Sequence, residues 1–81
     1  MKVNVRLFAR AKDLAGTSLI TIEMAPGATV GDLRRRLADE TPALAGILSQ
    51  SALAVNDDFA EDGLTLPVGA EIALLPPVSG G

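Results

Sequence analysis

Two segments near the start of the chain show the alternation of apolar and polar side chains that half-buried β-strands require. The alternation runs through residues 2–8 and again through residues 18–24. Because successive strand residues point to opposite faces, each segment would bury one face and expose the other, and we expect the two strands to pair antiparallel. Residues 9–16 between them lack this period, so we expect a short helical connection that ends at Gly16. The buried face would contain Val3, Val5, Leu7, Ile20, Ile22 and Met24.

A third segment has the period of a helix. Thr29 is followed three residues later by Asp32, which resembles a capping box with Asp in place of the usual Glu. Apolar residues then recur at helical spacing on one face, and Pro42 is expected to end the helix. The apolar face would consist of Val30, Leu33 and Leu37.

The second half of the chain predicts shorter elements. Residues 43–51 are rich in Ala and Leu and would hold another short helical turn. Residues 53–56 and 71–75 favour strands, with a short element at 64–66, and clusters of Asn, Asp and Gly between them favour turns. The order predicts an α+β, ubiquitin-like fold: a mixed sheet of four to five strands with one main helix across a face.

The composition removes most familiar catalytic chemistries. A chain of 81 residues has room for one small domain. It contains no Cys and no His, which excludes disulfides, thiolate or imidazole zinc sites, a Cys nucleophile and a His base. We therefore expect no metal site, no bound cofactor and no catalytic side chain of the protein's own.

Charge is divided unevenly along the chain. All 7 basic residues lie within residues 1–36, whereas 7 of the 10 acidic residues lie within residues 37–81. An acidic half repels phosphate backbones and anionic lipids, so we expect a protein partner and neither nucleic acid nor membrane. The sequence shows no apolar run long enough to span a bilayer and no signal-peptide stretch at its start, which favours a cytoplasmic protein.

Three consecutive arginines, Arg34, Arg35 and Arg36, suggest an anion site at first sight. Adjacent residues of a helix are about 100° apart around its axis, so these side chains would spread widely rather than converge. We expect them to form a solvated face.

The last six residues carry the strongest motif. Pro76 and Pro77 lack N–H donors and fix φ, so they would end strand pairing, and the segment extends up to about 20 Å. Gly80 and Gly81 have no side chains and would pass through a channel too narrow for other residues. The reactive group at the tip would be the α-carboxylate of Gly81. A carboxylate is a poor electrophile, so an external enzyme that uses ATP would have to activate it as an acyl adenylate.

Four segments together carry a family resemblance. They are residues 5–16 (VRLFARAKDLAG), 55–56, 71–73 and, above all, Pro76-Pro77-Val78-Ser79-Gly80-Gly81. Over its whole length the chain resembles the sulfur carriers of the ThiS/MoaD family, which include the small subunits of molybdopterin synthase. The resemblance implies a β-grasp domain over residues 1–75 and an extended tail over residues 76–81.

The resemblance also implies a chemistry for the tail. A MoeB-type adenylyltransferase would use ATP to adenylate Gly81, and sulfur would then replace the adenylate to give a thiocarboxylate. Residues Pro76, Pro77, Val78, Ser79 and Gly80 would enter the active site of a MoaE-type large subunit. There the sulfur would be donated to cyclic pyranopterin monophosphate to build the molybdopterin dithiolene, in a heterotetramer of two large and two small subunits.

Four more residues are candidate partner contacts. Phe59 lies among acidic residues, which favours an exposed loop and a partner anchor, although it could also fold back onto the core. Phe8 would either cover the outer face of the sheet, where partners dock, or lie under a loop. By resemblance, Lys12 would contact the activating enzyme, whereas an isolated surface cation is more often merely solvated. Leu75 precedes the prolines at a position where the family often has an aromatic residue.

Other functions remain open at this point. The chain could carry sulfur for another pathway, such as thiamine, cysteine or tRNA thiolation. It could be a ubiquitin-like modifier joined through Gly81 to lysines of target proteins. It could also be an interaction module whose tail has no chemical role.

Overall fold

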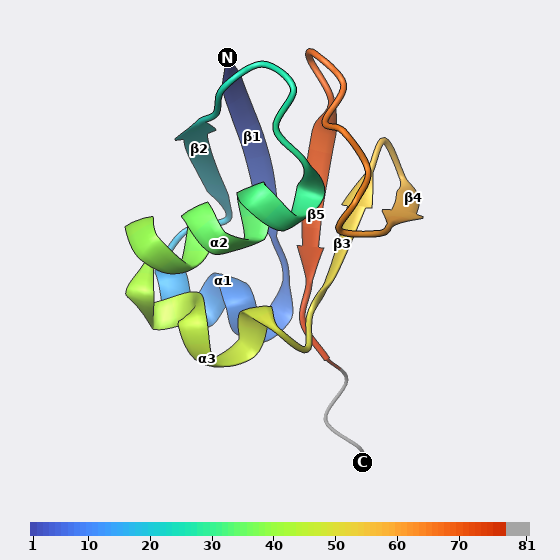
Figure 1. Ribbon diagram of the computed structural model, residues 1–81. Coiled ribbons are helices and arrows are strands. Elements are labelled where there is room, and N and C mark those ends of the chain that lie inside the picture. The colour runs from blue at the N-terminus through green and yellow to red at the C-terminus, as the bar shows by residue number, and fades with distance from the viewer. Residues whose placement is uncertain (78–81) are drawn as a thin grey trace.

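The computed structural model describes residues 1–77, in which a five-stranded sheet packs against helices (Figure 1). The strand order is β2-β1-β5-β3-β4, with β1 parallel to β5 and the other neighbours antiparallel. This mixed sheet crossed by one main helix, α2, is the expected ubiquitin-like β-grasp. In chain order the elements are β1 (Lys2–Leu7), α1 (Ala9–Ala15), β2 (Leu19–Glu23), α2 (Val30–Glu40), η1 (Pro42–Leu44), α3 (Ala45–Leu48), β3 (Ala52–Val55), β4 (Asp58–Ala60) and β5 (Glu71–Leu75).

The core lies between the helices and the face of the sheet that the alternating pattern predicts. Burial alternates along β1, and the predicted apolar face of α2 has no exposed surface. Removal of these aliphatic side chains from water is the main force that holds the helix on the sheet. Among the fully buried side chains are Val5, Ile22, Val30, Leu33, Leu37, Leu53, Ile72 and Leu74.

The end of α1 and the start of α2 lie where the sequence predicts them. Helix α1 ends at Gly16, whose φ of 74° is left-handed, a conformation that glycine adopts without steric cost. At the start of α2, the Thr29 hydroxyl accepts a hydrogen bond from Asp32 N at 3.2 Å. The Thr29 N–H donates to the Asp32 carboxylate at 2.9 Å, which completes the capping box. Residues 43–51, where a helical turn was expected, hold the end of η1 and α3.

The β3–β4 hairpin departs from the expectation that residues 56–58 form only a turn. Asn56 and Asp57 both have positive φ, at 51° and 71°, and the chain returns directly as β4. A two-residue turn with positive φ at both positions matches the twist of an antiparallel pair, so the second strand follows at once.

The element expected at residues 64–66 is not a strand. Thr65 forms an isolated bridge with Thr29, and the backbone on either side bonds to the start of α2. Val30 N donates to Leu64 O at 2.9 Å, and Leu66 N donates to Ala28 O at 2.9 Å. The segment is thus held by the helix start rather than by a neighbouring strand.

No helix within residues 1–77 has the length and apolar character needed to cross a bilayer.

The capping box leads to a prediction about Asp32. Its carboxylate accepts a hydrogen bond from the Thr29 backbone N–H, the largest of several contacts that hold its pKa below the ordinary value of 3.8. The Thr29 side chain is the next contact that lowers the pKa. Thr29→Ala removes its hydroxyl and keeps the backbone N–H, so the pKa should rise part of the way toward 3.8, and the loss of the helix cap should cost about 1 kcal/mol of stability. Carbon NMR of the carboxyl group during an acid titration, together with urea unfolding at neutral pH, measures both effects.

The sign of the pH dependence follows from the lowered pKa. Because the folded pKa lies below the ordinary value of 3.8, the stabilisation is complete above that pH and is lost as pH falls through the folded pKa. The acid-dependent part of the stability should therefore be smaller in Thr29→Ala. Thr29→Ser keeps a hydroxyl and is the control, and an equal pKa in the Ala and Ser variants would contradict this account.

Candidate functional site

An apolar groove of about 820 Å³ lies at the end of the sheet where β1 and β5 finish. Because these two strands are parallel neighbours, the residues that follow them emerge at the same end. Figure 1 shows both strands running toward the side on which α1 begins. The groove is lined by Phe8, Ala9, Arg10, Gln50, Ala52, Phe59, Leu75, Pro76 and Pro77.

The sheet register explains why distant residues meet in this groove. On the face away from the helices, Ala54 of β3 lies between Phe59 of β4 and Ala73 of β5. The next row pairs Ala52 with Leu75. Small alanine side chains thus lie between the larger side chains of Phe59 and Leu75 on this face, and Ala52 is the one among them that lines the groove.

Large apolar side chains remain exposed around the groove. Phe59 is 78% exposed and Phe8 is 44% exposed. Phe59 does not fold back onto the core, and it lies on the edge strand β4 rather than in the loop that its acidic neighbours suggested. Phe8 follows β1 in extended conformation as the N-cap residue of α1, and it is not buried under a loop. Exposed aromatic residues that share one groove are typical of a protein-binding surface.

The predicted site residues divide into two groups. Phe8, Phe59, Leu75 and the two prolines come together in the groove, whereas Lys12 is exposed on α1 and does not line it. Their roles in partner binding stay predictions. Val78, Ser79, Gly80 and Gly81 lie outside the described residues.

Two polar residues of the groove were not predicted from the sequence. Arg10 lies two positions after Phe8, at the start of α1, so the end of the first strand was a signal that could have indicated it. Gln50 follows α3, and no local pattern links it to the other residues. Arg10 gives the groove a cationic group next to the end of β1. This cation favours a partner that places an acidic group opposite Arg10.

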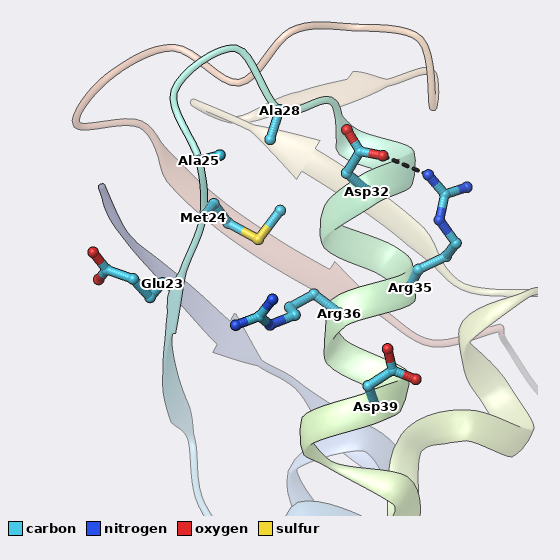
Figure 2. A pocket seen from close by; sticks show the side chains of 8 residues that line it. All are labelled: Glu23, Met24, Ala25, Ala28, Asp32, Arg35, Arg36 and Asp39. Atoms are coloured by element: carbon cyan, nitrogen blue, oxygen red, sulfur yellow. Dashed lines mark hydrogen bonds and ion pairs between the residues drawn. The ribbon is translucent and has the colours of Figure 1, made fainter.

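A smaller cavity of about 280 Å³ lies between the segment after β2 and helix α2 (Figure 2). Its charged groups largely neutralise one another. Arg35 pairs with Asp32, and Arg36 pairs with Glu40 at 2.5 Å. Within residues 1–77, no three acidic side chains gather closely enough to hold a metal ion. The apolar groove is therefore the stronger candidate site.

Known proteins show which family shares this fold and sequence. A molybdopterin synthase sulfur carrier subunit from Arabidopsis thaliana is 33% identical over 81 residues, which cover 100% of this chain and 84% of the relative. The crystal structure of SAMP1 from Haloferax volcanii matches with a TM-score of 0.85 and 32% identity over 100% of both chains.

A third match is a chain from the complex of subunits 1 and 2 of molybdopterin-converting factor from Helicobacter pylori 26695. It has a TM-score of 0.70 and 30% identity, and the match covers 100% of both chains. The ThiS family matches residues 5–81. With its β-grasp sheet and its match across nearly the whole length, the chain belongs to the ThiS family.

Proposed function

We propose that this protein is the sulfur carrier of a molybdopterin synthase, and that its Gly81 carboxyl group bears the sulfur as a thiocarboxylate. The observation that carries the proposal is the position of Pro76 and Pro77 at an exposed apolar groove. A partner that binds this groove contacts the base of the tail at the same time. Relatives named as molybdopterin synthase sulfur carrier subunits, and a family match that extends to residue 81, support it.

The proposed chemistry takes place entirely at the terminal carbonyl. The Gly81 carboxylate attacks ATP on a MoeB-type adenylyltransferase, which forms an acyl adenylate and releases pyrophosphate. A sulfur nucleophile then displaces AMP and leaves the thiocarboxylate. The chain has no Cys or His to catalyse these steps, so its side chains serve recognition and the enzymes supply catalysis.

Sulfur donation is proposed to occur in the active site of a MoaE-type large subunit. In this proposal the groove binds the surface of the large subunit, and the tail enters its active site and reaches the substrate, cyclic pyranopterin monophosphate. The similarity to a subunit of the Helicobacter pylori complex supports a large-subunit partner. The protein then acts as the sulfur-donating subunit of a sulfurtransferase rather than as an enzyme by itself.

The terminal chemistry can be tested by intact mass spectrometry. After incubation with ATP, the adenylyltransferase and a sulfide source, the chain should gain the mass that replacement of one oxygen by sulfur adds. A variant with one alanine added after Gly81 keeps a free carboxylate but displaces it from the activating site. It should stay unconverted, and equal conversion of the extended chain would refute the proposal.

Docking through the groove can be tested with Phe59→Ala. Phe59 is 78% exposed, so its loss should change the free energy of unfolding by less than about 0.5 kcal/mol. Binding to the large subunit, measured by calorimetry, should weaken at least about tenfold if this ring is an anchor. Val68→Ala is the matched control, because Val68 is 86% exposed but does not line the groove. Equal affinities of the two variants would count against the groove as the docking surface.

A second candidate function is protein modification. It is favoured by the similarity to small archaeal modifier protein 1 of Haloferax volcanii, which is 32% identical over 84 residues. In that case a lysine amine of a target protein attacks the Gly81 adenylate, releases AMP and forms an isopeptide bond. The last Lys or Arg of the chain is Arg36, so trypsin would leave residues 37–81 on each modified lysine. We expect cells to contain the thiocarboxylate and none of these adducts, and recovery of the adducts alone would favour modification.

A further inference from the structure

One of the three arginines of α2 does not belong to the solvated face that their spacing predicts. The side chain of Arg34 is 18% exposed, whereas that of Arg35 is 76% exposed. The three arginines do spread around the helix axis, but neighbouring segments of the chain cover the side of the helix on which Arg34 lies. The structure therefore corrects the expectation for Arg34 and upholds it for Arg35.

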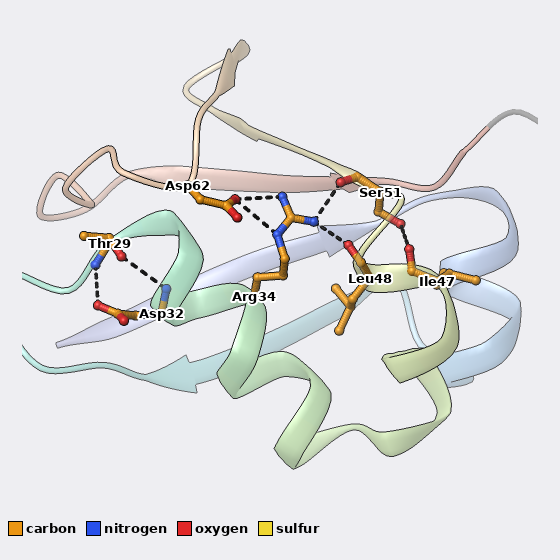
Figure 3. Close-up of polar contacts among 7 residues, drawn as sticks. All are labelled: Thr29, Asp32, Arg34, Ile47, Leu48, Ser51 and Asp62. Carbon is orange, nitrogen blue, oxygen red and sulfur yellow. Dashed lines mark hydrogen bonds and ion pairs between the residues drawn. The ribbon is translucent and has the colours of Figure 1, made fainter.

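Arg34 uses its guanidinium group to contact two separate segments (Figure 3). Its Nε and Nη2 atoms donate to one carboxylate oxygen of Asp62, at 3.2 and 3.0 Å. Its Nη1 atom donates to the backbone carbonyl of Ser51 at 2.8 Å and to that of Leu48. A planar fork with several donors suits such simultaneous contacts better than the single ammonium group of lysine does.

The two segments are the two ends of the β3–β4 hairpin. Ser51 immediately precedes β3, and Asp62 follows β4 by two residues. Arg34 thus ties the entry and the exit of the hairpin to the same turn of α2. The Ser51 hydroxyl adds a hydrogen bond to Ile47 O at 2.7 Å, which fixes the entry to α3.

The exit of the hairpin approaches the helix closely. Gly31 N donates to Asp62 O at 2.9 Å. A Cβ atom at Gly31 would lie 3.2 Å from Asp62 Cβ, which is tighter than ordinary contact. The absence of a side chain at Gly31 therefore lets Asp62 lie within reach of Arg34.

The hairpin needs these anchors because β4 is weakly held. It has three residues and lies at the edge of the sheet, where among residues 1–77 it pairs only with β3. Short edge strands with few buried contacts belong to the least stable parts of a fold. The hairpin nevertheless carries two residues of the groove, Ala52 and Phe59. The position of Phe59 thus depends on how the hairpin ends are fixed.

We propose that Arg34 is a positioning residue for the docking groove. Through Ser51 and Asp62 it holds the β3–β4 hairpin so that Phe59 stands beside Leu75 at the base of the tail. Arg34 itself does not line the groove, and its effect on the partner passes through Phe59. This inference rests on the proposed function, in which the groove docks on the large subunit.

A double-mutant cycle tests whether Arg34 affects partner binding through Phe59. Affinity for the large subunit is measured for the wild type, Arg34→Met, Phe59→Ala and the double variant, all at a temperature where each is folded. Arg34→Met should weaken binding about tenfold alone but by less than about twofold in the Phe59→Ala background, because the two residues act through one contact. Arg35→Met is the matched control, since Arg35 is exposed and pairs with Asp32 of the same helix. It should bind like the wild type.

Hydrogen exchange supplies a readout that does not need the partner. Arg34→Met should speed exchange in β4 and at the start of β3, and leave the central strands β1 and β5 unchanged. If Arg34→Met does not fold, Asp62→Asn replaces it in both measurements, because it removes the ion pair and keeps the backbone bond to Gly31.

The possible outcomes separate the two proposals. Equal weakening by Arg34→Met in both backgrounds, or unchanged binding, overturns the role of Arg34 in docking. Unchanged exchange in β4 overturns its role as the anchor of the hairpin. A wild-type chain that does not bind the large subunit at all contradicts the proposed function, while the exchange rates still decide whether Arg34 holds the hairpin.

Discussion

The pairing of β1 with β5 at the centre of the sheet is the constraint on which the rest of the structure depends. These strands are far apart in the sequence, yet their parallel register joins Val5 to Ile72 and Leu7 to Leu74. All four side chains are buried under the helices, so hydrophobic burial secures the pairing. The parallel direction brings Phe8 and Pro76 out at one end of the sheet. A groove at the base of the tail is a direct result of this topology.

The two faces of the sheet use side chains of different size. Branched aliphatic residues fill the core, while alanines occupy the outer face of β3 and β5. The chain contains 2 phenylalanines and no tryptophan or tyrosine, and both phenylalanines lie at the groove. The fold thus achieves its stability without aromatic residues and keeps the large apolar area of both rings for a partner. That division agrees with the proposed function, in which the groove binds the partner and the terminal carboxyl group carries the sulfur.

The regular elements could be predicted because their signals are local. Alternation defined β1 and β2, and the capping box with its apolar face defined α2. Strand β4 was missed because three residues are too few to show a period, and because its turn depends on positive φ at Asn56 and Asp57. The tail motif and the candidate contacts Phe8, Phe59 and Leu75 could be selected from the sequence. Their meeting in one groove could not, since it requires the strand order. The partial burial of Arg34 could not be predicted either, because its partner Asp62 lies 28 residues away in the sequence.

The small side chain of Ala52 leaves open space in the groove next to Leu75. Replacement of Ala52 by a larger residue would fill part of the groove, and Ala52 does not belong to the aliphatic core cluster on the opposite face of the sheet. A large subunit with a matching recess would accept such a carrier, and the native one would be obstructed. Steric bulk at this position therefore offers a way to create carrier and synthase pairs that do not exchange partners within one cell.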